Sequence, residues 1–231
     1  MRPDAAAAPE GESDRPMHLS REEESRIDAR VAALEGRTGA QVVAAVIGKC
    51  DAYPEIPWKA FALGVALATL VAALASQLQA GWHAPGGALI QALAVLGSGA
   101  AAAALAVFVP PFARLFLDPL RAEAEVRQYA QAMFLARELY RTPAHVGILL
   151  LVSRFERRIV ILPDTGVRRR IAEADLAAVI AAMAEPLRAD GIAPALHAGL
   201  DALEAQLAKR GFAGGAKSDE IAEALVQEKG V

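Results

Sequence analysis

The stretch AFALGVALATLVAALASQLQAGWHAPGGALIQALAVLGSGAAAAALAVFVPPFA, residues 60–113, decides how this chain is organised. It has 54 consecutive positions without Asp, Glu, Lys or Arg, whereas these residue types make up 22% of the 231-residue sequence. At about 1.5 Å per residue, a helix over residues 60–80 spans the hydrocarbon core of a bilayer, which is about 30 Å thick. A helix over residues 86–109 is also long enough. The sequence therefore predicts two adjacent transmembrane helices.

The ends of both segments carry the signals expected of a membrane hairpin. The sequence GWHAP at residues 81–85 predicts the turn between the helices. Pro110 and Pro111 end the second helix because proline has no amide donor. Trp58 and Trp82 fall at the two ends of the first span, at the depth that indole rings prefer. The alternative is a buried, Ala-rich hairpin of a soluble bundle, but such a helix needs one polar face, and neither segment has one.

Small residues occur along both predicted spans, and two interpretations of them remain open. They allow the two backbones to approach closely, or they are simply filler in an Ala-rich sequence. The residues concerned are Gly64, Ala68, Gly97, Gly99 and Ala101.

Basic residues predict the orientation of the hairpin. The turn between the helices has no Lys or Arg, whereas Lys49 and Lys59 precede the first span and Arg114, Arg121 and Arg127 follow the second. Since cytoplasmic loops carry the excess of Lys and Arg, both soluble flanks are expected on the cytoplasmic side of the membrane, joined by a two-pass anchor.

The composition excludes several classes of function. A net charge of −3 gives no basis for nucleic-acid binding. A single cysteine, Cys50, excludes an internal disulfide and a CxxC-type zinc site. The bilayer and another membrane protein are the predicted partners, and no cofactor is predicted.

Outside the hairpin, the pattern predicts an α/β domain that is split in two. Ser20 and Glu23 form a capping box before a helix, and apolar runs at residues 41–48, 146–153 and 157–162 predict three strands. Long helical patterns cover residues 119–140, 172–188 and 194–210. The first two strands are expected to pair in parallel, with residues 119–140 as the crossover helix.

The predicted organisation has five parts. They are a disordered tail (1–17), the first part of the α/β domain (18–57), the transmembrane hairpin (58–110), the second part of the domain (111–210) and a flexible tail (211–231) with a short helix near 221–227.

The strands and their turns resemble the TPM domain family. The resemblance rests on the residues TGAQVV (38–43), GILLLVS (147–153) and ERRIVI (156–161), followed by a turn that ends in Gly166. It covers residues 18–50 and 118–210, and residues 50–58 resemble the segment before an inserted hairpin in a bacterial membrane-anchored subgroup. This likeness implies that the anchor lies in a bacterial inner (plasma) membrane. The resemblance implies an α/β/α sandwich, here with an inserted two-helix transmembrane hairpin.

The resemblance also implies two kinds of function. Some members are acid phosphatases or bind divalent cations, and others serve the assembly or repair of membrane complexes. This chain keeps Glu156 and Gly166, but residues 142–145 replace the family's paired Asn, and residues 163–166 replace its Gly-Tyr-Gly turn. We therefore expect a non-enzymatic binding or assembly module, the alternative being a membrane-anchored, divalent-metal-dependent phosphatase.

The candidate binding residues are Glu156, Asp164 and the run Arg168, Arg169 and Arg170. A divalent cation needs oxygen ligands that converge at about 2.0–2.6 Å. Glu156 and Asp164 flank one strand and are too far apart to share an ion. Asp164 with Glu173 or Asp175 is the better pair, although acids at helix starts are usually caps.

The three arginines suit a phosphate or anionic lipid headgroups, or they form a solvated turn. His145 is expected to have a structural role.

Overall fold

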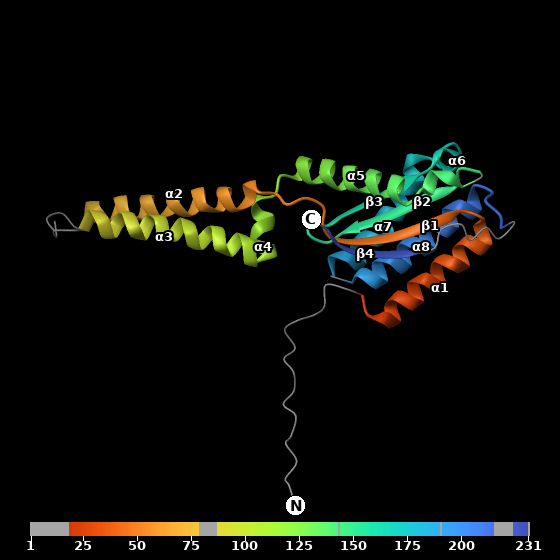
Figure 1. Cartoon of the computed structure of the whole chain (residues 1–231), viewed down its shortest axis with the longest axis horizontal. Coiled ribbons are helices and arrows are strands. Elements are labelled where there is room, and N and C mark those ends of the chain that lie inside the picture. The colour runs from red at the N-terminus through yellow and green to blue at the C-terminus, as the bar shows by residue number, and fades with distance from the viewer. Residues whose placement is uncertain (1–18, 79–86, 143, 190, 215–223, 231) are drawn as a thin grey trace, which may run out of the picture. The chain divides into compact units, whose positions relative to one another are not determined.

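The computed structural model describes residues 19–78, 87–142, 144–189, 191–214 and 224–230. The predicted tail at residues 1–17 and the predicted turn at 81–85 lie outside these ranges. The helices and strands follow the chain in this order (Figure 1): α1 (Arg21–Thr38), β1 (Gln41–Lys49), α2 (Glu55–Leu78), α3 (Gly87–Phe108), α4 (Pro110–Ala113), η1 (Arg114–Phe116), α5 (Pro119–Ala136), η2 (Leu139–Arg141), β2 (Gly147–Ser153), β3 (Arg158–Pro163), α6 (Thr165–Arg168), α7 (Glu173–Arg188), α8 (Ile192–Lys209) and β4 (Leu225–Gly230).

The chain divides into two compact units. The first comprises residues 1–44, 141–148 and 163–227, and the second comprises residues 45–140, 149–162 and 228–231. Each of the four strands has residues in both units.

The strands form one sheet in the order β3-β2-β1-β4. The amide of Gln41 donates to the oxygen of Val146 (3.2 Å), and the amide of Arg154 donates to that of Ile47 (2.9 Å). Both partners advance together along the chain, so β1 and β2 are parallel as predicted. β2 and β3 form an antiparallel hairpin, in which the amide of Asp164 reaches the oxygen of Gly147 (2.8 Å). All of β2 is buried, as in a strand covered on both faces.

The first unit contains α1, α7 and α8, and α8 packs against both of the others. The predicted capping box is confirmed: the Ser20 hydroxyl accepts from the Glu23 amide, and the Glu23 carboxylate accepts from the Ser20 amide. The buried face of α1 consists of Ile27, Val31, Leu34 and Thr38. It repeats every three or four residues, which is the spacing of one helical face.

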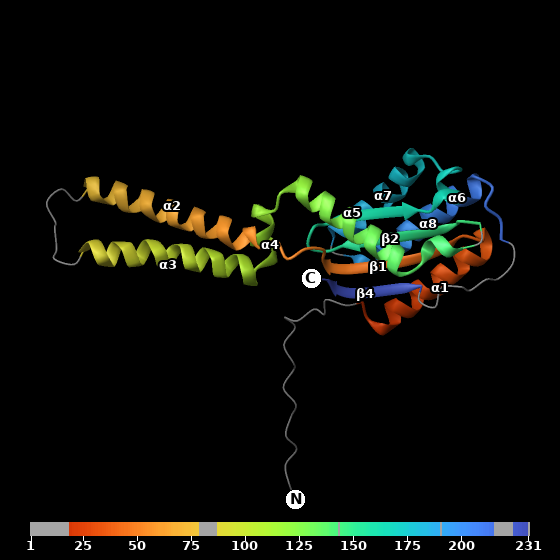
Figure 2. The same cartoon turned by 45° about the horizontal axis from the view of Figure 1, so that its top comes forward.

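The second unit contains α5 and the antiparallel pair α2 and α3. Figures 1 and 2 show α5 running along the sheet, and α2 and α3 lying side by side. Ala122, Val126, Ala130 and Met133 form the buried face of α5. The predicted fold class is confirmed: an α/β/α sandwich with a two-helix hairpin inserted after its first strand.

Two glycines let α2 and α3 approach closely. A Cβ atom at Gly64 would lie 2.8 Å from the backbone oxygen of Ser98, and one at Gly99 would lie 2.6 Å from Val65 Cγ2. Nothing lies within 4 Å of a Cβ at Gly97. Close approach is therefore the correct interpretation for Gly64 and Gly99, but not for Gly97.

Helices α2 and α3 are long and apolar enough to cross a membrane. The candidate spans are Glu55–Gln77 and Gly87–Phe108, and only 6% and 11% of their most apolar windows are buried. A core helix of a soluble protein is mostly buried, so this exposure distinguishes the pair from the Ala-rich core hairpin that was the alternative. Large exposed side chains cover both helices: Trp58, Leu63, Leu67, Leu70, Val71, Leu74, Leu89, Ile90, Leu93, Leu96, Leu105, Val107 and Phe108.

The C-terminal prediction is wrong where it placed a flexible tail with a short helix, because residues 225–230 form the strand β4. β4 lies at the edge of the sheet beside β1. Two of its side chains form hydrogen bonds with residues outside the strand. The Gln227 side chain accepts from the Leu19 amide (2.9 Å), and the Tyr129 hydroxyl donates to Glu228 (2.6 Å). The local sequence LVQEKG has too few apolar residues for its period to identify a strand.

Candidate functional site

Glu156 lies in the four-residue turn between β2 and β3, in the second unit. Its carboxylate is buried. One oxygen accepts a hydrogen bond from the Cys50 amide (2.9 Å), and the other accepts a short one from the Ser153 hydroxyl. The carboxylate therefore holds the end of β1 against the turn that follows β2. Both hydrogen-bond donors to Glu156 are residues of the same unit, and ligand binding by Glu156 stays a prediction.

Cys50 and Tyr53 lie beside this carboxylate. Burial, together with the negative charge of Glu156, raises the pKa of the Cys50 thiol from 9.0 to about 12. Burial, followed by the Glu156 charge, also raises the pKa of Tyr53. The Tyr53 hydroxyl is buried near Glu156 without a hydrogen bond of normal geometry. Both groups are thus kept neutral around one buried anion, which makes Cys50 a poor nucleophile at neutral pH.

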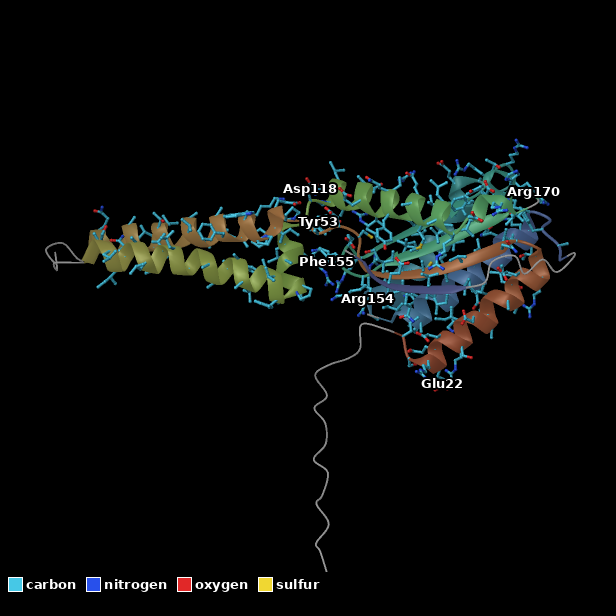
Figure 3. The ribbon with its side chains drawn as sticks, viewed as in Figure 1. Glu22, Tyr53, Asp118, Arg154, Phe155 and Arg170 are labelled. Atoms are coloured by element: carbon cyan, nitrogen blue, oxygen red, sulfur yellow. The ribbon has the colours of Figure 1, made fainter. Side chains whose placement is uncertain are left out.

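An aromatic pair connects the Glu156 turn to the base of the hairpin. The rings of Tyr53 and Phe155 are 5.8 Å apart, and Figure 3 shows these two side chains close together. They belong to one buried apolar cluster, whose other members are Ile56, Ala60, Ala106 and Ala113. The cluster therefore joins the first turns of α2, the end of α3 and the β2–β3 turn.

Arginines border this cluster. Arg114 donates from Nε to the backbone oxygen of Phe155 (3.0 Å). Arg121 forms ion pairs with Asp51 (2.8 Å) and Glu55 (2.9 Å), and its guanidinium lies 5.6 Å from the centre of the Tyr53 ring. These contacts bind the chain before α2 to the chain after α3. The sequence showed the acids and arginines that flank the hairpin, but not that they meet.

Asp164 lies in the first unit, at the end of β3. It is buried, and it caps α6 by accepting from the Thr165 amide (2.6 Å). Its other oxygen lies 3.1 Å from His145 Nδ1. A Cβ at Gly166 would lie 2.2 Å from the Ala144 oxygen, so only glycine fits between the two turns. The sequence reasoning considered His145 and Asp164 separately and missed that they pair.

The His145–Asp164 pair has the geometry of an oriented imidazole. The carboxylate accepts from Nδ1 when that nitrogen is protonated, which leaves Nε2 as an acceptor, and the His145 side chain is 59% exposed. Such a contact fixes the orientation of the imidazole ring.

Asp175, at the start of α7, acts as a cap. Asp175 accepts from the Ala172 amide (3.0 Å) and pairs with Arg210 (2.6 Å), and these contacts lower its pKa. Among the described residues, no group of three or more His, Cys, Asp or Glu side chains is placed to hold a metal ion. Asp164 and Asp175 therefore both make capping contacts, and a cation shared by Asp164 with Glu173 or Asp175 stays a prediction.

The three arginines after β3 have different surroundings. Arg170 donates to the backbone oxygens of Arg210 (2.9 Å) and Gly211 (2.7 Å), and it stacks on Phe212 with 4.0 Å to the ring centre. Arg168 donates to the Pro163 oxygen (3.2 Å). Arg169 is exposed. Arg170 therefore fixes the chain after α8, and anion binding by the three stays a prediction.

Three comparisons with known proteins bear on the family. A model described as the TPM domain matches residues 88–206, just over half of the chain. The solved NMR structure of the BA42 protein from the psychrophilic bacterium Bizionia argentinensis is similar, with a TM-score of 0.56, 13% identity and coverage of 94% of this chain and 99% of that one. At this identity, the likeness shows a common fold alone. No curated protein matches.

Proposed function

Since this chain belongs to the TPM domain family, we propose that it is a membrane-anchored TPM module that binds another membrane protein and supports its assembly. The observation that carries this proposal is the apolar surface of α2 and α3. Leucine, valine and phenylalanine side chains point outward along both helices, and exposed apolar surface on this scale is stable only against lipid or another protein.

The proposal also concerns the membrane and the sidedness of the protein. We place the hairpin in a bacterial inner membrane as a two-pass anchor, with both flanks in the cytoplasm. Lys59 at the start of α2 and Arg114 after α3 are at the same end of the hairpin, because Lys59 Nζ donates to the backbone oxygen of Phe116 (3.2 Å). Positive charge at that end supports a cytoplasmic position for it.

A binding role is favoured over hydrolysis by the contacts of the acids. Glu156, Asp164 and Asp175 are each engaged by backbone amides of their own unit. Each of these carboxylates has at least one oxygen occupied by an internal donor, which supports a structural role for the three acids.

Cross-linking inside the membrane tests the binding role. A photoreactive residue at Leu93, which is exposed on α3, is expected to give one discrete protein adduct in native membranes. The matched control is Phe61, whose ring faces Gly99 on the partner helix, and it is expected to give no adduct with another protein. Lipid adducts alone at Leu93 would contradict the binding role.

A hydrolysis assay tests the alternative. The purified protein is expected to leave a generic phosphomonoester unhydrolysed during titration with magnesium or calcium. Hydrolysis that depends on the cation and disappears in Asp164→Asn would assign the phosphatase role instead.

A further inference from the structure

The chain between α3 and α5 carries large apolar side chains that the rest of the protein leaves uncovered. We refer to residues 108–120 as the α3–α5 connection, and it contains α4 and η1. Phe108 is 81% exposed, Leu115 is 76% exposed and Leu120 is 79% exposed. Among the described residues, one other large apolar side chain is more than 70% exposed, namely Trp58 in the first turn of α2. The most exposed apolar side chains thus lie where the chain enters and leaves the hairpin.

We propose that the α3–α5 connection lies in the membrane interface, with Leu115 and Leu120 inserted into the lipid just below the headgroups. The partner of this surface is the bilayer. The contact belongs to neither of the two candidate spans, the second of which ends at Phe108. This inference rests on the proposed membrane anchoring, and it adds a third contact with the lipid, made by the chain that leaves the hairpin.

One side of the α3–α5 connection is packed and the other is open. Phe112, Phe116 and Leu117 pack against the buried cluster at the base of the hairpin, and the rings of Phe112 and Phe116 are 5.4 Å apart. Leu115 lies in the same run of residues and is exposed. Because the packed side is fixed against the protein, the connection presents Leu115 outward.

The connection is positioned at the depth of the lipid headgroups. Figures 1 and 2 show α4 running across the end of the α2–α3 pair. A segment that crosses the ends of two membrane-spanning helices runs parallel to the bilayer surface. Lys59 Nζ donates to the backbone oxygen of Phe116 (3.2 Å), which places η1 beside the first turns of α2. Trp58 and Lys59 mark the headgroup level there, because indole rings and lysine side chains prefer that depth.

The composition of the connection favours lipid as its partner. Residues 108–117 read FVPPFARLFL and contain one charged residue, Arg114, whose Nε donates to the backbone oxygen of Phe155 (3.0 Å). Exposed side chains at Leu105, Val107 and Phe108 lead from α3 into the connection. The apolar surface of the second span therefore continues onto the connection, and the lipid around the span covers both.

The apolar surface ends soon after Leu120. The exposed side chains in the following turns of α5 include Glu123, Arg127 and Gln128, which prefer water. The change from apolar to polar side chains within two turns of one helix indicates that α5 leaves the membrane interface there.

Spin labelling at single positions tests the depth of the connection. The label is attached to Leu115→Cys, Leu120→Cys, Leu70→Cys or Gln128→Cys, each in a Cys50→Ser background, and the full chain is reconstituted in phosphatidylcholine vesicles. Oxygen concentrates in the hydrocarbon and a nickel chelate stays in water, so the ratio of the two accessibilities rises with depth. We expect the ratio at positions 115 and 120 to be several-fold higher than at 128 and lower than at 70, as for side chains buried by about 5–10 Å at the headgroup boundary.

A charge in the connection tests whether the two leucines insert together. Leu115→Asp is expected to lower the ratio at position 120 at least twofold, because a carboxylate draws the connection toward water. The matched control is Leu135→Asp, which changes a leucine that is 62% exposed farther along α5, and it should leave the ratio at position 120 unchanged. An equal effect of the two substitutions would contradict the proposal.

The remaining outcomes separate this proposal from the proposed function. Ratios at 115 and 120 equal to that at 128, with a high ratio at 70, would place the connection in water and overturn the proposal while the anchor stands. Labels at 115 and 120 that neither oxygen nor nickel reaches would show that a second copy of the chain covers them, which also overturns it. A ratio at 70 as low as at 128 would show that α2 is not in the bilayer, and the proposed function itself would then fail.

Discussion

Glu156 accepts a hydrogen bond at 2.9 Å from the backbone amide of Cys50, 106 positions earlier in the chain. The chain between them includes the whole hairpin. One buried carboxylate thus links the chain before the inserted helices, at the end of β1, to the chain after them, in the turn that follows β2.

Removing this carboxylate should destabilise the protein. In Glu156→Ala, the Cys50 amide and the Ser153 hydroxyl lose their acceptor while they remain buried, at a cost of about 1–3 kcal/mol for each unsatisfied group. We expect a clear fall in the melting temperature of the detergent-solubilised protein. Glu123→Ala is the matched control, because Glu123 is an exposed glutamate of α5, and it should change stability by less than about 0.5 kcal/mol. Equal melting temperatures for the two variants would contradict the role given to Glu156.

Cys50 gives a prediction on pH. Its pKa is raised from 9.0 to about 12 in the folded protein. Between these values, the unfolded chain loses the thiol proton and the folded chain keeps it, so stability should fall as the pH rises through that window. Tyr53 and Tyr129, whose pKa values are also raised, contribute in the same direction.

The contribution of Cys50 is isolated by comparison with Cys50→Ser. The free energy of unfolding should fall less steeply above pH 9 in this variant than in the parent. Parallel curves would show that the folded thiol ionises as readily as an unfolded one.

The two glycine environments in the hairpin predict opposite results for the same substitution. In Gly64→Leu, the side chain would meet the Ser98 backbone oxygen and Ala102, so α2 and α3 must separate and the melting temperature in detergent should fall. In Gly97→Leu, the side chain enters open space, and the melting temperature should stay near that of the parent. Equal losses for both variants would indicate a general effect of size and not a helix contact.

A charge within the first span tests insertion. Leu70 is exposed in α2, and arginine there costs about 2.5–3.5 kcal/mol on insertion scales for a position near the bilayer centre. We expect Leu70→Arg to be lost from the carbonate-resistant membrane fraction, while Leu70→Ala stays in it. If both variants resist carbonate equally well, α2 does not cross the membrane as a lipid-exposed helix.

The main features of the fold could be predicted from local patterns. The charge-free run 60–113, the apolar strands and the Ser20–Glu23 box each depend on residues close in sequence, and each agrees with the structure. Strand β4 could not be predicted in this way. It forms a strand because it pairs with β1 at the edge of the sheet, and because Tyr129 and the Leu19 amide form hydrogen bonds with its side chains.

The candidate sites depend on tertiary contacts in the same way. Glu156 and Asp164 were identified as acids near turns, but their partners Cys50 and His145 come from other segments of the chain. The local sequence of a turn such as RFER (residues 154–157) does not indicate which distant residues the turn will contact.

The topology of the hairpin tests the central claim most directly, namely a domain that is split by a two-span anchor. Single cysteines at Ser25, Ala84 and Ala205, in a Cys50→Ser background, are exposed in intact cells to a membrane-impermeant thiol reagent. Ser25 and Ala205 are exposed positions on α1 and α8, and Ala84 lies between the two spans in the sequence. Both flanks must be on one side of the membrane, since β1 pairs with β2 in one sheet. We predict labelling at position 84 alone, and labelling at only one of positions 25 and 205 would contradict the two-span anchor.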